Sequence, residues 1–373
     1  MTSMPSRRLL EIARHPRRSW PEIRLALRAR RPSPPPAPDG SAPTIRALAL
    51  AVNASCAQAC PVCDIGPGRD TFLTRRLKGE TLTTEDCRKL AGDLRRWRPQ
   101  VSFHDAEPLM HPEWRAMVET FAGRGFFVSM TTAGTGLKEA ARDLAKSGLH
   151  HLEVSADGGS EEAYRAARAD GSLAGLEEGI RSLIAERKGP YPRISLNAVI
   201  SGFNAGRLGE MGEFAVRLGV PVLTFTQAFG VSGSLATRHN AALPRWPLTE
   251  SRSPGPSFDA AAAAEEISSI RSRHPGLVVA CSPDLAPAEA RRFRDTEEPL
   301  AGYARCRLAW SAMQVLPNGD ATSSLACFAP AYGNIRSEPP TRLWNSESAK
   351  AFRRALLGPA PPGCLRCGGL YCG

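Results

Sequence analysis

The sequence contains no long hydrophobic run. None of its apolar stretches approaches the roughly 18 residues that a membrane-spanning helix needs. A secretory signal is also missing, because the charged run from Glu11 to Arg18 leaves no apolar core behind the arginine pair at positions 7 and 8. Apolar residues make up 42% and charged residues 23% of the 373, a globular composition. We therefore expect a cytoplasmic protein.

Negative charge is scarce at the N-terminus. Residues 1–31 hold nine Arg against two Glu, a net +7 out of +11 for the whole chain. The Pro-rich stretch 32–38 follows as a stiff linker. We interpret residues 7–31 as a solvated basic helix, with peripheral contact to a membrane or to an anionic partner as the alternatives.

The ten cysteines do not fit a disulfide framework, because such frameworks occur in small secreted proteins. Cys87 and Cys281 stand apart and are interpreted as buried small hydrophobes. The other eight form two groups, and clustered spacings in a reducing compartment indicate metal ligation. The groups are Cys56, Cys60 and Cys63 near the front, and Cys306, Cys327, Cys364, Cys367 and Cys372 near the end.

Short apolar runs alternate with longer amphipathic stretches through the middle of the chain. Strands are predicted at 45–52, 100–104, 126–130, 150–155, 193–200 and 222–226, with a further short strand at 277–281. Helices are predicted at 84–97, 112–124, 138–147, 160–188 (broken near 171–175), 205–218 and 256–274, and a loop at 228–257. Six repeats of this kind imply an α/β fold with a parallel sheet, whose functional groups gather at the carboxyl ends of the strands.

Four segments follow from this pattern. Residues 1–43 form the basic helix and linker, and residues 44–230 form the parallel α/β unit. Residues 231–282 form a connecting loop and helix. Residues 283–373 form a small cysteine-bearing domain, in which two apolar runs around Asn318-Gly319 predict a hairpin.

The front cysteines follow the first predicted strand with the spacing Cys56-x3-Cys60-x2-Cys63. A [4Fe–4S] cluster usually takes four Cys ligands, but this loop supplies three. The next cysteine, Cys87, lies inside a predicted helix, so one iron would stay open for a ligand that is not protein. The alternative is a zinc site, which normally closes with four ligands, and the nearest histidine, His104, is remote in sequence.

The motif after a first strand resembles the signature of the radical S-adenosylmethionine (SAM) superfamily. The resemblance implies a partial (β/α)6 TIM-like barrel over residues 45–226 and a [4Fe–4S] cluster whose open iron is chelated by SAM. Reductive cleavage of SAM then gives a 5′-deoxyadenosyl radical that abstracts hydrogen from a substrate. The electron would come from an external flavodoxin- or ferredoxin-like donor.

Other stretches resemble the positions that contact SAM in this family. Glu107-Pro108 matches the end of a Gly-Gly-Glu-Pro motif that binds the amino group, with Asp105 and Ala106 in place of the glycines. Replacement of a glycine by Ala106 is expected to affect SAM binding little. Asp105, in contrast, is expected to adopt a conventional, negative φ. Its added carboxylate would bind the ammonium directly or face the substrate, which makes His104 and Asp105 the catalytic candidates.

Polar residues on or just after later strands resemble further SAM contacts. Ser155 matches a serine that contacts the ribose or the methionine carboxylate, with Asp157 either assisting it or acting as a turn residue. Asn197 matches a residue that reaches the ribose. After the third strand, Ala133 replaces the common Asn, which removes one polar contact.

The rear cysteines, with the hairpin between Cys306 and Cys327, resemble the auxiliary-cluster domain of the SPASM/Twitch subgroup. Five cysteines suffice for one auxiliary [4Fe–4S] cluster. The expected ligands are Cys306, Cys327, Cys364 and Cys367, with Cys372 spare or substituting. A zinc ribbon-like closure is the alternative, because Cys-x2-Cys pairs serve zinc equally well.

The resemblance therefore implies an enzyme acting on a peptide, a natural product or a cofactor precursor. Only about 43 residues precede the expected barrel, so leader-peptide recognition would need another protein or the basic arm. Two other classes stay open. They are a catalytically degenerate Fe–S scaffold, suggested by Asp105-Ala106, and a zinc-stabilised nucleic-acid-binding protein, suggested by the basic arm and the Cys pairs.

Overall fold

Parallel strands and helices alternate along the body of the chain. The computed structural model describes residues 16–29, 36–65, 77–228, 230–250, 255–296, 298–300, 306–323 and 330–367. The strands are β1 (Ala47–Leu50), β2 (Gln100–Phe103), β3 (Val128–Thr132), β4 (His151–Ser155), β5 (Arg193–Ile200) and β6 (Val222–Gln227). Between them lie α4 (Thr84–Asp93), α5 (Trp114–Ala122), α6 (Leu137–Lys146), α7 (Glu161–Arg168), α8 (Leu173–Glu186) and α9 (Gly209–Leu218).

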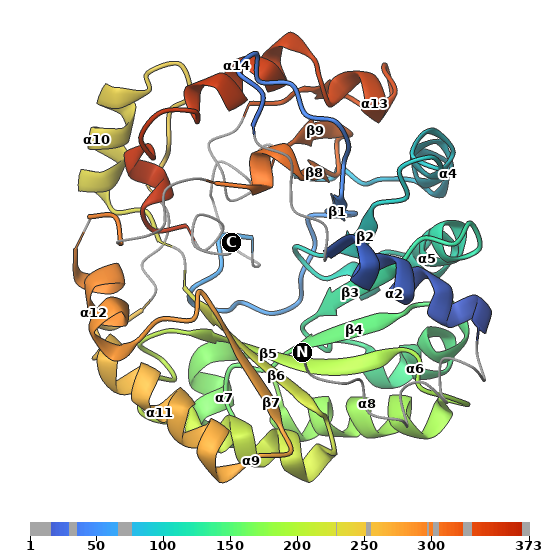
Figure 1. Ribbon diagram of the computed structural model, residues 1–373. Coiled ribbons are helices and arrows are strands. Elements are labelled where there is room, and N and C mark those ends of the chain that lie inside the picture. The colour runs from blue at the N-terminus through green and yellow to red at the C-terminus, as the bar shows by residue number, and fades with distance from the viewer. Residues whose placement is uncertain are drawn as a thin grey trace.

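These strands belong to one curved sheet that extends beyond six strands. The order is β10-β9-β8-β1-β2-β3-β4-β5-β6-β7, and every pair from β8 through β1 to β7 is parallel. Here β7 is Val278–Ser282, β8 Ala312–Val315, β9 Asp320–Thr322 and β10 Gly333–Asn334. The sheet curls with helices on its outer side, so the expected partial barrel is confirmed (Figure 1).

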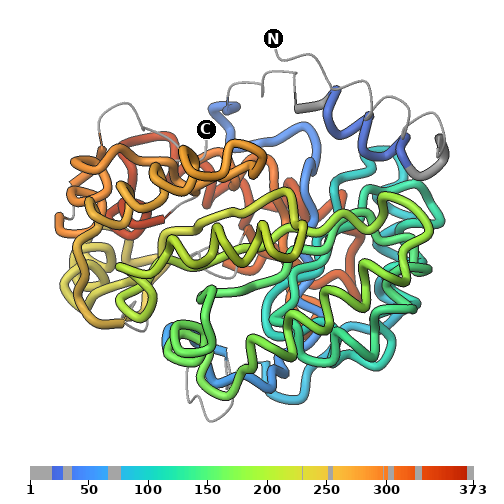
Figure 2. Tube along the Cα trace, turned by 90° about the horizontal axis from the view of Figure 1, so that it is seen from below, coloured from blue at the N-terminus to red at the C-terminus, as the bar shows by residue number. Residues whose placement is uncertain are grey.

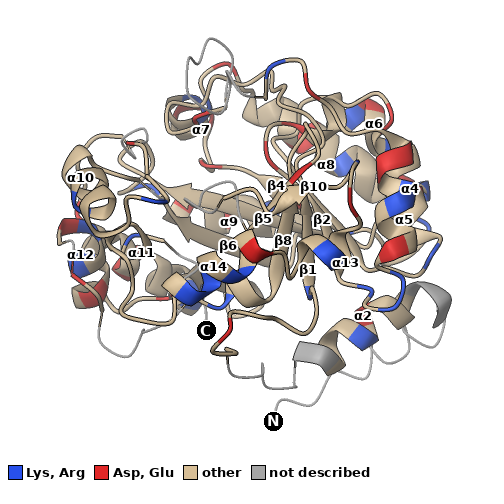
Figure 3. Ribbon diagram, turned by 90° about the horizontal axis from the view of Figure 1, so that it is seen from above, with Lys and Arg blue, Asp and Glu red and all other residues tan. Residues whose placement is uncertain are grey.

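The two faces of the sheet differ in polarity, and β4 illustrates the rule. Leu152 and Val154 are completely buried against the helices, whereas His151, Glu153 and Ser155 alternate with them and remain half-buried on the inner face. Because side chains along a strand point to opposite faces, this alternation separates an apolar outer core from a polar lumen. Charged groups lie mainly on the helices and loops (Figure 3).

The predicted elements agree with the structure in order, and one prediction is wrong. The break near 171–175 is confirmed, because α7 ends at Arg168 and α8 begins at Leu173. The loop predicted at 228–257 is wrong, because it contains α10 (Gly233–Ala242). The Ser232 hydroxyl accepts from the Leu235 N–H at the start of α10, and Leu235 packs in a small apolar cluster with Val231 and Leu248.

Two further helices complete the middle of the chain. The helix predicted at 256–274 is α11 (Ala260–Arg273), and it packs against α12 (Pro287–Asp295). The short strand predicted at 277–281 is β7, which pairs with β6 and becomes one edge of the sheet. Every candidate strand of the α/β unit is therefore present.

The basic N-terminal segment contains α2 (Pro16–Ala29), which lies beside the chain that follows α5 (Figures 1 and 2). Glu22 accepts a hydrogen bond from the Tyr191 hydroxyl (2.6 Å) and pairs with Arg193 (3.3 Å). On the opposite side Trp20 is 57% and Leu27 54% exposed. None of the described helices is long and apolar enough to cross a membrane.

The C-terminal segment is joined to the barrel by its hairpin. The predicted turn is confirmed, because β8 and β9 are antiparallel around Gly319, whose φ is +86°. The first hairpin strand also pairs in parallel with β1, so this segment continues the barrel sheet. Two helices, α13 (Pro340–Leu343) and α14 (Glu347–Ala355), follow it.

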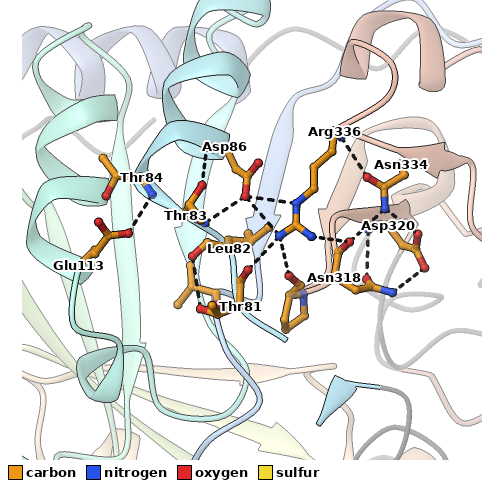
Figure 4. Close-up of polar contacts among 12 residues, drawn as sticks. Thr81, Leu82, Thr83, Thr84, Asp86, Glu113, Asn318, Asp320, Asn334 and Arg336 are labelled. Carbon is orange, nitrogen blue, oxygen red and sulfur yellow. Dashed lines mark hydrogen bonds and ion pairs between the residues drawn. The ribbon is translucent and has the colours of Figure 1, made fainter. Parts of the chain in front are cut away.

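Arg336 connects the hairpin turn to the start of α4 (Figure 4). Its guanidinium donates to the carbonyl oxygens of Thr81 (2.9 Å) and Asn318 (3.2 Å) and pairs with the buried Asp86 carboxylate (3.3 Å). Asp86 in turn accepts from the Thr83 N–H in a capping box. One side chain thus holds together two segments about 250 residues apart in sequence.

Arg336→Ala is expected to lower the free energy of unfolding by about 1–3 kcal/mol, because it removes the charge partner of the buried Asp86 carboxylate and one donor to each of several carbonyl oxygens. Urea denaturation followed by circular dichroism measures this loss. Arg88→Ala is the matched control, since Arg88 pairs with Glu85 on the exposed side of the same helix, and about 0.5 kcal/mol or less is expected there. Equal effects of the two substitutions would contradict the connecting role of Arg336.

Candidate functional site

The three front cysteines lie in one loop at the carboxyl end of β1. Cys60 is buried, and Cys56 and Cys63 are half-buried. Burial raises the pKa of the Cys60 thiol to about 11; the Arg168 guanidinium opposes this shift, and Cys63 and Cys56 add to it. Burial also raises the pKa of Cys56, with Glu107 and Cys63 contributing. The three sulfurs therefore lie close enough to influence one another.

The arrangement of these thiols suits a cluster better than a single metal ion. Within the described ranges, no three His, Cys, Asp or Glu side chains converge on one point as an ion requires. A zinc site needs four ligands at about 2.0–2.3 Å, whereas each thiolate of a cluster binds a different iron, so the sulfurs need not converge. The loop thus fits a [4Fe–4S] cluster held at three corners.

Glu107 lies next to this loop, fully buried at the carboxyl ends of β2 and β3. Its carboxylate accepts hydrogen bonds from the Thr132 hydroxyl (2.8 Å) and the Ala133 N–H (2.7 Å). Its backbone N–H donates to the Ser55 carbonyl (2.9 Å), one residue before Cys56. Burial raises the pKa of the Glu107 carboxyl, and these hydrogen bonds oppose the shift. A carboxylate is thus held rigidly beside the cysteine loop.

The rear cysteines lie in short turns of the C-terminal segment. Cys306 precedes a 3-10 turn (Leu308–Trp310), and Cys364 and Cys367 are joined by a backbone hydrogen bond of 3.0 Å. Burial raises the pKa of the Cys306 thiol, while the Ala309 and Leu308 N–H groups oppose the shift by donating to its sulfur. Cys327 and Cys372 lie outside the described residues, so the auxiliary ligand set remains a prediction.

Two family models match this chain. Residues 51–215 match the radical SAM superfamily, and residues 306–368 match the SPASM iron–sulfur cluster-binding domain. The first match contains the cysteine loop and Glu107, and the second contains Cys306, Cys364 and Cys367.

The chain belongs to the radical SAM superfamily. It is an enzyme of that superfamily with a SPASM-type domain, and the cofactors of these domains are a [4Fe–4S] cluster with SAM and auxiliary Fe–S clusters.

Relatives with named activities share moderate sequence identity with this chain. A GTP 3′,8-cyclase of Marinobacter nauticus is 28% identical over 260 residues, which cover 68% of this chain and 70% of the relative. The PqqA peptide cyclase of Rhizobium meliloti is 30% identical over 167 residues, covering 44% of this chain and 42% of the relative. Streptococcus suis SuiB has a TM-score of 0.63 at 12% identity, covering 84% of this chain and 69% of that one. The structural likeness shows the fold alone.

The radical SAM domain has an unusual backbone just before Glu107. Asp105 has φ +67° and Ala106 φ +48°, both in the left-handed region. The expectation that Asp105 demands a conventional φ is therefore wrong. The family's paired glycines adopt such angles freely, whereas an L-residue with a Cβ pays roughly 1–2 kcal/mol. Surrounding contacts therefore force this strand end to keep the geometry that glycine would give.

Ala106→Gly is expected to raise the free energy of unfolding by about 0.5–1 kcal/mol, because relief of left-handed strain exceeds the entropy that glycine adds to the unfolded chain. Thermal melting of the purified protein measures the change. Ala140→Gly, inside α6, is the control and should lower it by about 1 kcal/mol. Destabilisation at both positions would show that Ala106 carries no strain.

One contact that restrains this backbone comes from the hairpin. Gln314 on β8 donates a short hydrogen bond to the Asp105 carboxylate, whose other oxygen lies 3.1 Å from His104 Nδ1. Burial would raise the pKa of Asp105, but His104 and Gln314 bring it below its usual value. Burial would lower the pKa of His104, but Asp105 outweighs this effect and the net shift is upward. The structure thus favours an ion pair here.

The His104–Asp105 pair faces the lumen of the radical SAM domain. Its two side chains are 31% and 24% exposed. Glu153 on β4 is near enough to contribute to the raised pKa of His104, and its own carboxylate accepts from the Thr131 hydroxyl (3.3 Å). Strands β2, β3, β4 and β8 therefore contribute polar groups to one part of the lumen.

The remaining SAM candidates have different surroundings. Ser155 and Asn197 are register partners on β4 and β5, and Asn197 accepts from the Thr226 hydroxyl (2.9 Å). Asp157 is buried, and both its oxygens are bound by the protein, one by the Val199 N–H (2.7 Å) and the other by Arg168 (2.7 Å). Ser155 and Asn197 thus lie side by side on neighbouring strands, whereas Asp157 holds protein groups.

The sequence analysis missed three residues that contribute to the site. Gln314 carried no local signal, because its role depends on the pairing of β8 with β1. Ala133 was treated as a lost contact, yet its backbone N–H binds Glu107 whatever its side chain is. Arg168 did carry a signal, since it lies on the buried side of α7 with Tyr164 and Ala167, where a helix normally has apolar residues.

Proposed function

We propose that this radical SAM enzyme acts on a peptide or a peptide-like precursor held in the barrel lumen, with one auxiliary [4Fe–4S] cluster in the SPASM-type domain. The observation that carries the proposal is the placement of the Cys56–Cys63 loop directly beside the buried carboxylate of Glu107. A cluster held by three thiolates beside an anionic group for the methionine ammonium is the arrangement that SAM cleavage requires. When bound, the reduced cluster and SAM supply the hydrogen-abstracting radical.

The roles of the chain's own residues follow from their positions. Cys56, Cys60 and Cys63 would hold the cluster, and Glu107 would bind the amino group of SAM. Ser155 and Asn197 lie side by side on the inner face and would contact the ribose or carboxylate. In this proposal Asp157 orients Arg168 and does not touch SAM.

The charge of the lumen favours a peptide over a nucleotide triphosphate. The GTP 3′,8-cyclases among the relatives act, by name, on a polyanion, whereas PqqA peptide cyclase acts on a peptide. In this chain the His104–Asp105 ion pair, which carries no net charge, and one further carboxyl group, Glu153, face the same part of the lumen. Carboxylates repel phosphates and attract ammonium groups, so we propose a substrate that presents a neutral or cationic group to this region.

Anaerobic reconstitution followed by reduction in the presence of SAM tests the proposal. Release of 5′-deoxyadenosine, with about eight irons per chain, is expected for two four-iron clusters. An iron content of about four per chain would contradict the presence of an auxiliary cluster. Formation of the clusters without release of 5′-deoxyadenosine would support the alternative of a catalytically degenerate Fe–S scaffold. Zinc without iron would support the nucleic-acid-binding alternative.

We also propose that an external flavodoxin- or ferredoxin-like protein supplies the electron. The N-terminal 31 residues carry a net charge of +7, which suits an anionic partner, and α2 presents Trp20 and Leu27 on its outer side. Peripheral contact with an anionic membrane is the alternative occupant of this helix. Cosedimentation with anionic vesicles separates the two.

A further inference from the structure

A buried arginine reaches the cysteine loop from α7. Arg168 is 8% exposed, and its Nη1 lies 3.9 Å from the Cys60 sulfur and 3.5 Å from Gln58 Oε1. Gln58 itself donates to the Ala133 carbonyl (3.4 Å), so the loop is tied to the end of β3 as well. The guanidinium therefore approaches one particular sulfur of the loop.

The position of Arg168 is determined from its other side. Its Nε lies 2.7 Å from the Asp157 carboxylate, which is itself buried and bound to the Val199 N–H. The Asn204 amide donates to the Asp157 carbonyl (2.9 Å). A Cβ on Gly158 would lie 2.2 Å from the Tyr164 nitrogen, so α7 packs directly on the turn that carries Asp157.

The burial of Arg168 and Asp157 destabilises the folded protein unless the arginine charge has a function. Burying a guanidinium and a carboxylate carries a desolvation penalty that a single ion pair often fails to offset. An arginine that only anchored the loop could be replaced by a well-packed apolar residue. A donor aimed at a thiolate sulfur, in contrast, needs the positive charge, which the neighbouring Asp157 carboxylate partly compensates.

We propose that Arg168 is a positioning residue that donates to the Cys60 sulfur and makes the radical SAM cluster easier to reduce. The inference rests on the proposed function, because it requires Cys60 to be a cluster ligand. Hydrogen bonds to cluster sulfurs and nearby charge set the reduction potentials of Fe–S centres. Reduction adds one negative charge to the cluster, so a cationic donor stabilises the reduced form more than the oxidised form.

The test is a redox titration of the reconstituted full-length protein with dithionite, followed by electron paramagnetic resonance. The signal that changes on addition of SAM identifies the radical SAM cluster. At a fixed potential, Arg168→Gln is expected to lower the ratio of reduced to oxidised cluster about tenfold, which corresponds to 59 mV for a one-electron couple. Arg165→Gln is the matched control, because Arg165 lies on the same helix, is 65% exposed and pairs with Glu161; its titration should match the wild type.

Asp157→Asn gives a second, opposite test. Asn can still accept from the Val199 N–H, but it leaves the Arg168 charge uncompensated, so the cluster should become easier to reduce than in the wild type. A wild-type titration curve for Arg168→Gln with full iron content would overturn the inference. If Arg168→Gln fails to hold iron, an unchanged or lower potential in Asp157→Asn would overturn it instead. Failure of the wild-type protein to form any SAM-responsive cluster would refute the proposed function itself.

Discussion

Replacing Cys60 with alanine is expected to reduce the absorbance of the reconstituted protein near 400 nm by about half and to abolish its SAM cleavage. Substitutions in the outer shell of a metal site commonly cost about 10–100-fold, so loss of one of only three protein ligands should exceed about 10³-fold. Iron and sulfide analysis together with 5′-deoxyadenosine release measure the two effects. The auxiliary cluster should survive, leaving about four irons per chain.

Cys87→Ala is the matched control for this substitution. Cys87 is completely buried inside α4, where burial raises the pKa of its thiol, and it lies among apolar side chains of the core. Its loss should cost about 1 kcal/mol of stability through a small cavity and leave both iron content and SAM cleavage unchanged. Equal iron loss in the Cys60 and Cys87 variants would indicate general unfolding instead of loss of a ligand.

Glu107→Gln is expected to weaken SAM binding to the reconstituted protein by about 10–100-fold, because hydrogen bonds to charged groups contribute about 1.5–3 kcal/mol. The variant loses the negative charge that would pair with the ammonium, and its amide NH₂ would face the donors of Thr132 and Ala133. Equilibrium dialysis with labelled SAM measures the affinity. Iron content should remain at the wild-type value, since Glu107 is not a cluster ligand.

Glu113→Gln provides the control for Glu107. The Glu113 carboxylate accepts from the Thr84 N–H (3.1 Å) at the start of α4, so the same chemical change is made at a helix terminus. SAM affinity should be unaffected there. An unchanged affinity in Glu107→Gln would refute its assignment to the amino group.

The pH dependence of SAM binding follows from the raised pKa of Glu107. Because burial raises this pKa, the folded protein favours the protonated carboxyl, and the stability gained this way is lost as pH rises through the folded-state value. An ammonium needs the carboxylate, so SAM affinity should increase as the pH rises through the raised pKa of Glu107, which lies above the ordinary value for a Glu carboxyl.

Local patterns in the sequence were sufficient for most of the fold. Arg193–Ile200 was predicted residue for residue, and the hairpin at Asn318-Gly319 is present. Alternating apolar residues, turn dipeptides and the cysteine spacing act over a few residues, so they can be read without knowing distant neighbours. The helix α10 was not predicted, because only a four-residue apolar cluster and a serine cap support it.

The sequence by itself determined that three cysteines follow the first strand and that a Glu-Pro motif follows the second, and these two motifs predict the chemistry of the site. Only the tertiary structure decided how that site is supported. Pairing of β8 with β1 brings Gln314 to Asp105, and packing of α7 on the turn after β4 brings Arg168 to Cys60. Gln314 and Arg168 are separated from their partners by 209 and 108 residues. Contacts of that span depend on how the chain closes in space, which no local pattern encodes.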